Sequence, residues 1–417
     1  MTKEFLAKEK SYFRKLHSDA QKLIQTIFLF NFIGPLFSVF INAFLWRQTH
    51  DIVTISIYNL IMYAVIPVGF YVNGYLLRKY APAIPYTASL LVDGIAILIL
   101  MFLPTITLPA VIIFSLVDGL FAGVYWANRN LLTLKTTSTH DRIYFSSIES
   151  ASGTITSVII PALIGLFITF GTFIHLYTPL QGYQLLVVYM IGMILWIGTI
   201  SKSITAGRST KPPLLVKNSN KNWIIFRWIQ FIYGLLNSVT YFIPILVVLI
   251  LIGNEATLGI VQSISAVIAS LLIYWVGTSL NTSHRLQLIF LGILFAIIGT
   301  FIFGYLYSAF GVLIFFAAQA LSQQFIWVGG SSVNYDLIDN DNKDEKQHYA
   351  YVCDQEIYLN GGRVGGILLF LLILHLTTNT FALRFAPVII ACTQFFLLFA
   401  YAAIEKNLKT KHVVSLT

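Results

Sequence analysis

The sequence predicts an all-α membrane protein of about twelve transmembrane helices, arranged as two pseudo-symmetric bundles of six helices. Of the 417 residues, 57% are hydrophobic and only 10% are charged, whereas a soluble domain usually carries about 25% charged residues. Long apolar runs recur along the chain and short polar loops separate them. Sequence motifs of the first half also return in the second half, which is the pattern of a duplicated fold.

The apolar runs give the individual spans. A run of about 20 apolar residues is long enough to cross the hydrocarbon core of a bilayer as a helix. Short polar segments, such as 48–51 and 253–255, mark where one span ends and the next begins. The predicted spans are 23–47, 52–77, 84–104, 108–134, 144–171, 183–201, 222–252, 255–280, 286–308, 310–335, 349–376 and 379–404.

The basic residues predict the orientation of these spans. With both termini in the cytoplasm, the inside loops hold nearly all Lys and Arg residues that lie between spans, and the outside loops hold only Arg47 and Arg384. This bias agrees with the positive-inside rule for multi-pass proteins. It predicts a location in the cell inner (plasma) membrane, in contact with membrane lipids. Because the charges are scattered over short loops, the net charge of +9 does not indicate a nucleic-acid partner.

A basic, polar segment at 202–221 divides the chain near its middle and contains Pro212 and Pro213. We expect residues 1–201 to form an N-terminal six-helix bundle, residues 202–221 a cytoplasmic linker, and residues 222–417 a C-terminal six-helix bundle.

Four pairs of residues support the repeat at a nearly constant offset. Each pair couples one residue of the first half with one of the second, and the order is the same in both halves: Gly69 and Gly277, Pro35 and Pro244, Trp126 and Trp327, Glu149 and Glu356. Duplicated halves are usual in secondary transporters, whose substrate site lies between the halves near the middle of the membrane.

The spans, the repeat and the glycine-asparagine turns resemble the major facilitator superfamily. In the two turns, Gly69 precedes Asn73 and Arg78-Lys79, and Gly277 precedes Asn281 and Arg285. The chain departs from the loop signature of that family, because Asn73 and Asn281 stand where an acid is expected and Leu76 replaces a glycine. The resemblance implies a secondary transporter that works by alternating access, with a cavity lined by the first, fourth, seventh and tenth spans.

Charged residues within spans are candidate site residues, because a charge in hydrocarbon costs about 3 kcal/mol or more and normally faces a cavity or a partner. Arg129 in the fourth span and Glu149 in the fifth lie near the same membrane face, so we expect them to pair. Either they serve function, with Arg129 holding an anionic group and Glu149 exchanging a proton, or they form a permanent structural ion pair.

The eleventh span carries a second polar stripe. Glu356, Asn360 and Arg363 are spaced four and three residues apart, so they share one helix face. Arg363 lies near the predicted midplane and is the first candidate for holding a substrate. The alternative is a stripe closed on itself as a gate or strut.

Uncharged polar and aromatic residues complete the predicted substrate site. In the seventh span, Tyr233, Asn237 and Tyr241 follow one another on one face, although they could instead bond helices together. The predicted substrate-binding residues are Arg363, Arg129, Asn128, Trp126, Tyr125, Asn31, Tyr58, Tyr233, Asn237, Tyr241, Gln323, Trp327 and Asn360.

The predicted energy source is an ion gradient. A nucleotide-binding Gly-x4-Gly-Lys-Ser/Thr loop is absent from the sequence, so ATP is not expected to drive the protein. The predicted proton-coupling residues are Glu149, Glu356, Asp118 and Asp354, while Asp93 is interpreted as a packing or hydration feature.

These patterns predict a secondary active transporter of a small polar, anionic organic solute, coupled to protons or another ion and monomeric. An exporter of lipophilic compounds, drugs or lipids is the first alternative. A receptor or scaffold on a transporter fold is the alternative of another class. The histidines form no spaced ligand set and the two cysteines no metal motif, so we expect neither an enzyme nor a cofactor or metal site.

Overall fold

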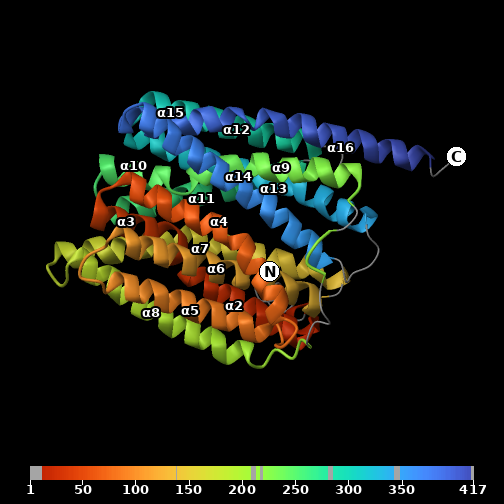
Figure 1. The fold of residues 1–417 in the computed structure, drawn as a ribbon, viewed down its shortest axis with the longest axis horizontal. Coiled ribbons are helices and arrows are strands. Elements are labelled where there is room, and N and C mark those ends of the chain that lie inside the picture. Colours follow the sequence, from red (N-terminus) through yellow and green to blue (C-terminus); the bar gives the residue numbers. More distant parts are fainter. Residues whose placement is uncertain are drawn as a thin grey trace, which may run out of the picture.

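The computed structural model describes residues 12–137, 139–207, 213–216, 219–279, 285–341 and 348–414. Within these ranges all regular secondary structure is helical, and twelve helices are long and apolar enough to cross a membrane. The chain is therefore a multi-pass membrane protein with the predicted all-α fold (Figure 1). The helices are α2 Ser18–Pro35, η1 Leu36–Phe40, α3 Ile41–Thr49, α4 Ile52–Leu76, α5 Ala83–Met101, α6 Leu108–Thr136, α7 Thr139–Phe173, α8 Pro179–Ser201, α9 Lys221–Thr240, α10 Ile243–Leu251, α11 Glu255–Ser279, α12 Arg285–Leu306, α13 Ala309–Asp341, α14 His348–Leu376, α15 Asn379–Cys392 and α16 Phe395–Val414.

Short polar side chains begin several of the spans. Asp51 accepts hydrogen bonds from the backbone N–H groups of Val53 and Thr54 at the start of α4, at 3.1 and 3.0 Å. Thr178 and Gln181 form a reciprocal capping box at the start of α8. These side chains satisfy N–H groups that have no partner inside the helix, so the polar loops of the sequence also fix where spans begin.

The first and seventh spans are interrupted, which the sequence analysis did not predict. In the first, Pro35 precedes a five-residue π-helix, η1, before α3 continues. In the seventh, α9 ends at Thr240, and α10 starts at Ile243 with Pro244 in its first turn. Proline lacks the N–H that continues an α-helix, so the paired prolines explain why corresponding spans of the two halves are both broken.

Other boundaries differ by a few residues. The third span ends at Met101 rather than 104, and the sixth begins at Pro179 rather than 183. The tenth span, α13, continues to Asp341 rather than 335. Apolar length measures what fits the bilayer, whereas a helix continues for as long as its backbone hydrogen bonds do, so the two ends need not coincide.

The helices form two groups in space. Most of the helices α2 to α8 pack on one another, and so do most of α9 to α16, whereas α7 and α11 pack mainly on each other (Figure 1). The two groups meet along α7 with α11 and along α4 with α14. Within each group some helices approach very closely at glycines: a Cβ atom on Gly123 of α6 would lie 2.9 Å from Cα of Gly69 in α4.

Candidate functional site

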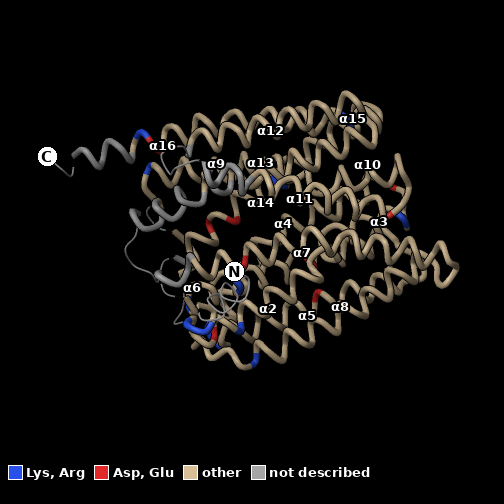
Figure 2. Tube along the Cα trace, turned by 180° about the vertical axis from the view of Figure 1, so that it is seen from behind, with Lys and Arg blue, Asp and Glu red and all other residues tan. Residues whose placement is uncertain are grey.

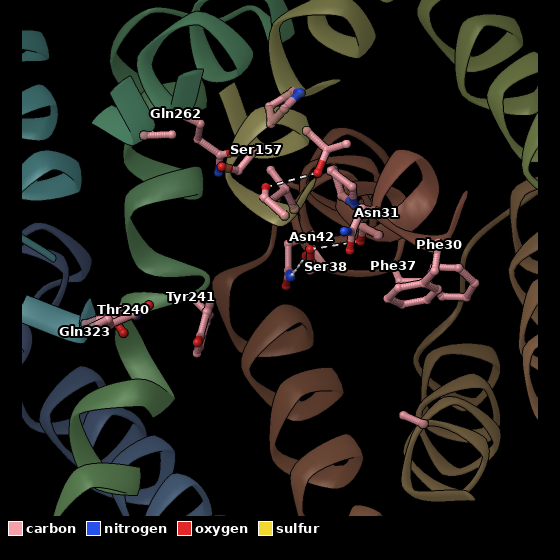
Figure 3. A pocket seen from close by; sticks show the side chains of 18 of the residues that line it. Phe30, Asn31, Phe37, Ser38, Asn42, Ser157, Thr240, Tyr241, Gln262 and Gln323 are labelled. Atoms are coloured by element: carbon pink, nitrogen blue, oxygen red, sulfur yellow. Dashed lines mark hydrogen bonds between the residues drawn. The ribbon is translucent and has the colours of Figure 1, made fainter. Parts of the chain in front are cut away.

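A cavity of about 930 Å³ lies between the two helix groups. Residues of nine spans line it, and they come from both groups. Pockets that hold small ligands measure about 300–1,000 Å³, so this cavity can enclose a small organic molecule. Figure 3 shows Asn31, Ser38 and Asn42 on one side of the cavity and Thr240, Tyr241 and Gln323 on the other.

Both helix interruptions contribute to the cavity wall. The π-helical segment supplies Phe37 and Ser38, and the end of α9 supplies Thr240 and Tyr241. The carbonyl of Ser38 accepts a hydrogen bond from Asn42 Nδ2 at 2.7 Å. Irregular backbone is tolerated at membrane depth where it lines a cavity, which agrees with the position of both interruptions.

An aromatic cluster forms the wall on the side of the first group. The ring of Phe30 stacks on Tyr125 with centroids 4.6 Å apart and on Phe37 at 6.0 Å. Trp126 meets Tyr125 edge to face at 5.3 Å. Aromatic faces provide a large apolar contact for a planar or apolar part of a ligand.

Arg363 of α14 is the only arginine or lysine among the residues that line the cavity. Its Nη1 donates to Asn360 Oδ1 at 3.0 Å, and its guanidinium lies over the ring of Tyr63, 4.9 Å from the centroid. Its Nε is buried and has no hydrogen-bond partner within the described protein, and no ion pair of Arg363 occurs there. A cation in this position retains donors for an anionic ligand.

The predicted stripe on α14 is present as a chain of hydrogen bonds. Asn360 Nδ2 donates to Glu356 Oε2 at 3.0 Å, and Asn360 Oδ1 accepts from Arg363. Glu356 and Asn360 are not among the residues that line the cavity, whereas Arg363 is. The three residues of the stripe are thus hydrogen-bonded in sequence, and of the three only Arg363 lines the cavity.

Two buried carboxyl groups also line the cavity. Asp93 of α5 and Asp118 of α6 are each 4% exposed. The hydroxyl of Tyr58 in α4 donates to Asp118 Oδ2 at 2.7 Å. From the sequence, Asp93 was interpreted as a packing or hydration feature. No sequence pattern around Asp93 predicted that it lines the same cavity as Asp118.

Gln319 of α13 is a lining residue that the predicted site did not include. Its side chain is 5% exposed, and neither its amide nitrogen nor its amide oxygen has a partner within the described protein. A buried amide without partners is costly, so this group is available to a ligand that both donates and accepts. In the sequence, Gln319 lies in a long, mostly apolar span, and no pattern there distinguished a residue that lines the cavity from one that packs between helices.

The predicted Arg129–Glu149 ion pair is present, with Nη2 of the arginine bonded to Oε1 of the glutamate. The guanidinium also lies over Trp126, 4.7 Å from the ring centroid. Neither Arg129 nor Glu149 lines the cavity. The pair connects α6 to α7 behind the aromatic wall.

A second intramembrane ion pair was missed in the sequence. Arg227 of α9 bonds Asp354 of α14 through Nε at 2.7 Å and Nη2 at 3.0 Å. Trp223 Nε1 donates to the same carboxylate at 2.7 Å. Arg227 lies within the predicted seventh span, 222–252. A charged residue inside a span is a candidate site residue, so this position could have identified Arg227.

The predicted substrate residues are divided by the structure into two sets. Those that line the cavity are Arg363, Trp126, Tyr125, Asn31, Tyr58, Tyr241 and Gln323. Those that do not are Arg129, Asn128, Tyr233, Asn237 and Asn360. The side chain of Trp327 lies outside the described residues. Among the four predicted proton-coupling residues, Asp118 lines the cavity and Glu149, Glu356 and Asp354 do not.

Asn128 instead joins the two halves near one end of the cavity. Its Nδ2 donates to Asn73 Oδ1 at 2.6 Å, and Asn73 Nδ2 donates to the hydroxyl of Tyr349 at 3.1 Å. Asn73 is the residue that stands where related loops are acidic. No cluster of His, Cys, Asp or Glu that could hold a metal ion occurs in the described part of the chain.

Comparison with known proteins places the fold. No family model matches the chain. It is 24% identical over 363 residues to a Bacillus subtilis (strain 168) protein named "Uncharacterized protein YqgE", covering 82% of this chain and 81% of that one. Among solved structures, the nucleoside transporter NupG superposes with a TM-score of 0.66 at 15% identity, over 93% of this chain and 99% of that chain.

A transporter of the POT family, solved in complex with a thioalcohol-conjugated peptide, superposes with a TM-score of 0.69 at 12% identity, over 92% of this chain and 96% of that chain. These likenesses confirm the predicted all-α fold with twelve candidate transmembrane helices, which the chain shares with these two transporters.

Proposed function

We propose that the protein is a secondary transporter that moves a small polar organic solute with an anionic group across the membrane by alternating access. The position of Arg363 carries this proposal. It is a half-buried cation whose buried Nε has no hydrogen-bond partner and which forms no ion pair in the described chain, and it faces a cavity between the two helix groups. The two solved structures of the same fold, a nucleoside transporter and a POT family transporter, support transport as the activity.

In this proposal Arg363 holds the anionic group and Gln319 and Gln323 bond polar parts of the solute. The aromatic cluster at Phe30, Tyr125 and Trp126 contacts its apolar part. A charge-assisted hydrogen bond contributes about 1.5–3 kcal/mol. The arginine is therefore expected to decide which solutes bind, while the aromatic wall tolerates several shapes.

The moving bodies in this proposal are the two bundles, residues 1–201 and 222–417, with residues 202–221 as the linker. We also propose that both termini are cytoplasmic and that the membrane is the inner (plasma) membrane. Figure 2 supports this orientation, because Lys and Arg gather at the end of the molecule where α2 begins. Protons are the proposed coupling ion, since carboxyl groups lie in the cavity wall.

An exporter of lipophilic compounds is the second candidate. The aromatic cluster and the acidic pair in the cavity wall favour it, because a lipophilic cation would use both. The two candidates differ in the sign of the charge that the cavity prefers, so one binding experiment separates them.

The test is a thermal-shift screen of the purified protein against monocarboxylates, dicarboxylates, amino acids, nucleosides, sugars and lipophilic cations. A ligand at a hundredfold excess over Kd stabilises the folded state by about 2.7 kcal/mol. We expect an anionic solute to raise Tm, and Arg363→Gln to weaken its binding about tenfold to a hundredfold. Arg363→Lys should retain part of the affinity.

Arg384→Gln is the matched control, because Arg384 binds the backbone carbonyls of Gly304 and Tyr305 and does not line the cavity. A response only to lipophilic cations would favour the second candidate. An anionic ligand that binds Arg363→Gln and the wild type equally would reject the role of Arg363.

A further inference from the structure

The cavity wall contains a pair of carboxyl groups that come from two neighbouring helices. Asp93 of α5 and Asp118 of α6 lie within hydrogen-bonding reach of each other. Each is 4% exposed, and each faces the cavity that holds Arg363. No other acidic residue lines this cavity among the described residues.

Among the described residues, no Lys or Arg forms an ion pair with either carboxyl group. From α4, the Tyr58 hydroxyl donates to Asp118 Oδ2 at 2.7 Å. From α8, which packs against α5, the apolar side chains of Met190, Ile191 and Ile194 surround Gly94, next to Asp93. The Oδ1 atom of Asp93 is buried and accepts no hydrogen bond within the described protein.

Two ionised carboxylates in such a place would repel each other in a medium of low dielectric constant. Neither would have an opposite charge to offset the repulsion or its lost hydration. One proton between the two groups removes one charge and supplies a donor for the second carboxylate. Paired carboxyl groups therefore bind and release that proton as a unit.

We propose that Asp93 and Asp118 hold one proton between them and form the proton-binding site of this transporter. The inference rests on the proposed transport function and names the group through which the proton gradient acts. Tyr58 orients Asp118 within the pair. A proton enters from the side to which the cavity is open, reduces the negative charge of the pair by one, and leaves on the other side after the bundles have moved.

The pair is connected to the proposed anion site. Helix α4 contacts both groups, because its Tyr58 bonds Asp118 and its Tyr63 lies under the guanidinium of Arg363, 4.9 Å from the ring centroid. A change of charge at the pair therefore alters the field at the arginine, which lines the same cavity. This arrangement couples the proton to the solute because both occupy one cavity.

The other acids of the spans are held differently. Glu149 is bonded to Arg129 and Asp354 to Arg227, so each already has a compensating cation. Glu356 receives a hydrogen bond from Asn360 and does not line the cavity. None of these three acids lines the cavity, which leaves Asp93 and Asp118 as the acidic pair in its wall.

Infrared difference spectroscopy of the purified protein tests the shared proton without any substrate. A protonated carboxyl group gives a C=O band that shifts in deuterium oxide. We expect this band at neutral pH in the wild type and its loss in the double variant Asp93→Asn/Asp118→Asn. Each single variant should shift the band, because each changes the hydrogen-bond partner of the remaining carboxyl group.

Asp51→Asn is the matched control, since Asp51 is an exposed helix cap that does not line the cavity. A band that persists unchanged in the double variant, or that either single variant leaves unchanged, would overturn the shared proton. If the double variant does not fold, the single variants decide, because asparagine has nearly the size of aspartate.

A second measurement uses protein in liposomes and the anionic ligand that the thermal-shift screen identifies. Asp118→Asn should abolish accumulation driven by a pH gradient but retain exchange of the solute at equal concentrations. Unchanged gradient-driven accumulation in both single variants would overturn the coupling role. If the wild type moves no solute, the proposed transport function fails, while the infrared result still decides whether the pair shares a proton.

Discussion

At the residue scale, the intramembrane charges fall into two kinds that their sequence positions do not distinguish. Arg129 and Arg227 each bind a carboxylate, and neither lines the cavity. Arg363 lies in the wall of the cavity without such a partner. An arginine that is paired with a carboxylate on a neighbouring helix joins the two helices. An arginine that faces a cavity without such a partner can bind a ligand.

The Arg129–Glu149 pair should act mainly on stability. Both side chains are about one-fifth exposed, and removing one member of a buried pair leaves an uncompensated charge. Arg129→Gln and Glu149→Gln should each lower Tm, and the double variant should recover part of the loss. A double-mutant cycle on thermal unfolding is expected to give an interaction energy of about 0.5–3 kcal/mol.

The same cycle distinguishes the two interpretations of this pair. If both single variants keep the Tm of the wild type but lose ligand binding, the pair serves the substrate rather than the fold. Arg384→Gln provides the comparison with an arginine that bonds only backbone carbonyls.

At the scale of elements, close helix crossings depend on glycine. A Cβ atom on Gly362 of α14 would lie 3.0 Å from Cα of Gly234 in α9 and closer still to the carbonyl of Phe231. Small residues let membrane helices approach until their backbones touch. These crossings hold α14, and with it Arg363, against α9.

Gly362→Ala should therefore lower the thermal stability and reduce ligand binding, because α14 must move away from α9. Gly192→Ala is the matched control, since a Cβ atom there meets nothing within 4 Å. Alanine is favoured over glycine in a helix by about 1 kcal/mol, so the control should be neutral or slightly stabilising. Equal Tm values for the two variants in detergent would contradict the importance of the crossing.

At the scale of the whole molecule, polar contacts hold the two helix groups together at the end where α3 meets α11. Arg47 of α3 bonds Glu255 of α11 through Nε at 2.8 Å and Nη2 at 3.1 Å. Arg47 also bonds the carbonyl of Gly253, and the hydroxyl of Tyr183 in α8 donates to Glu255 at 3.2 Å. The proposed alternating access requires these contacts between the groups to break when the cavity opens at this end.

Glu255→Gln should weaken this contact and favour opening at the Arg47 end. The measurement is labelling of Ser38→Cys, a cavity residue, by a membrane-impermeant thiol reagent in a background in which Cys353 and Cys392 are replaced by alanine. Labelling from outside the cell should become faster in Glu255→Gln. Asp51→Asn is the control, because Asp51 lies at the same end and its carboxylate bonds Val53 and Thr54 at the start of α4.

Labelling at the same rate in Glu255→Gln and the wild type would mean that the contact does not restrict opening.

The sequence by itself determined the number of spans, their approximate limits and the fold class. These properties follow from how apolar length and polar loops fit a bilayer, which is a local property of each segment. It also located Arg363 and the Arg129–Glu149 pair, because residues on adjacent spans at similar depth must lie close together. The paired prolines at Pro35 and Pro244 were visible as a repeat, although the breaks they produce were not predicted.

Only the tertiary structure decided which polar residues face the cavity. Asp93 and Asp118 lie on different helices, and their meeting depends on the rotation of each helix about its axis. The same rotation exposes Gln319 to the cavity and turns Asn237 and Asn360 away from its lining. Apolar runs with lipid on one side and protein on the other carry little periodicity, so helix rotation is fixed by packing across the whole bundle rather than by the sequence of any one span.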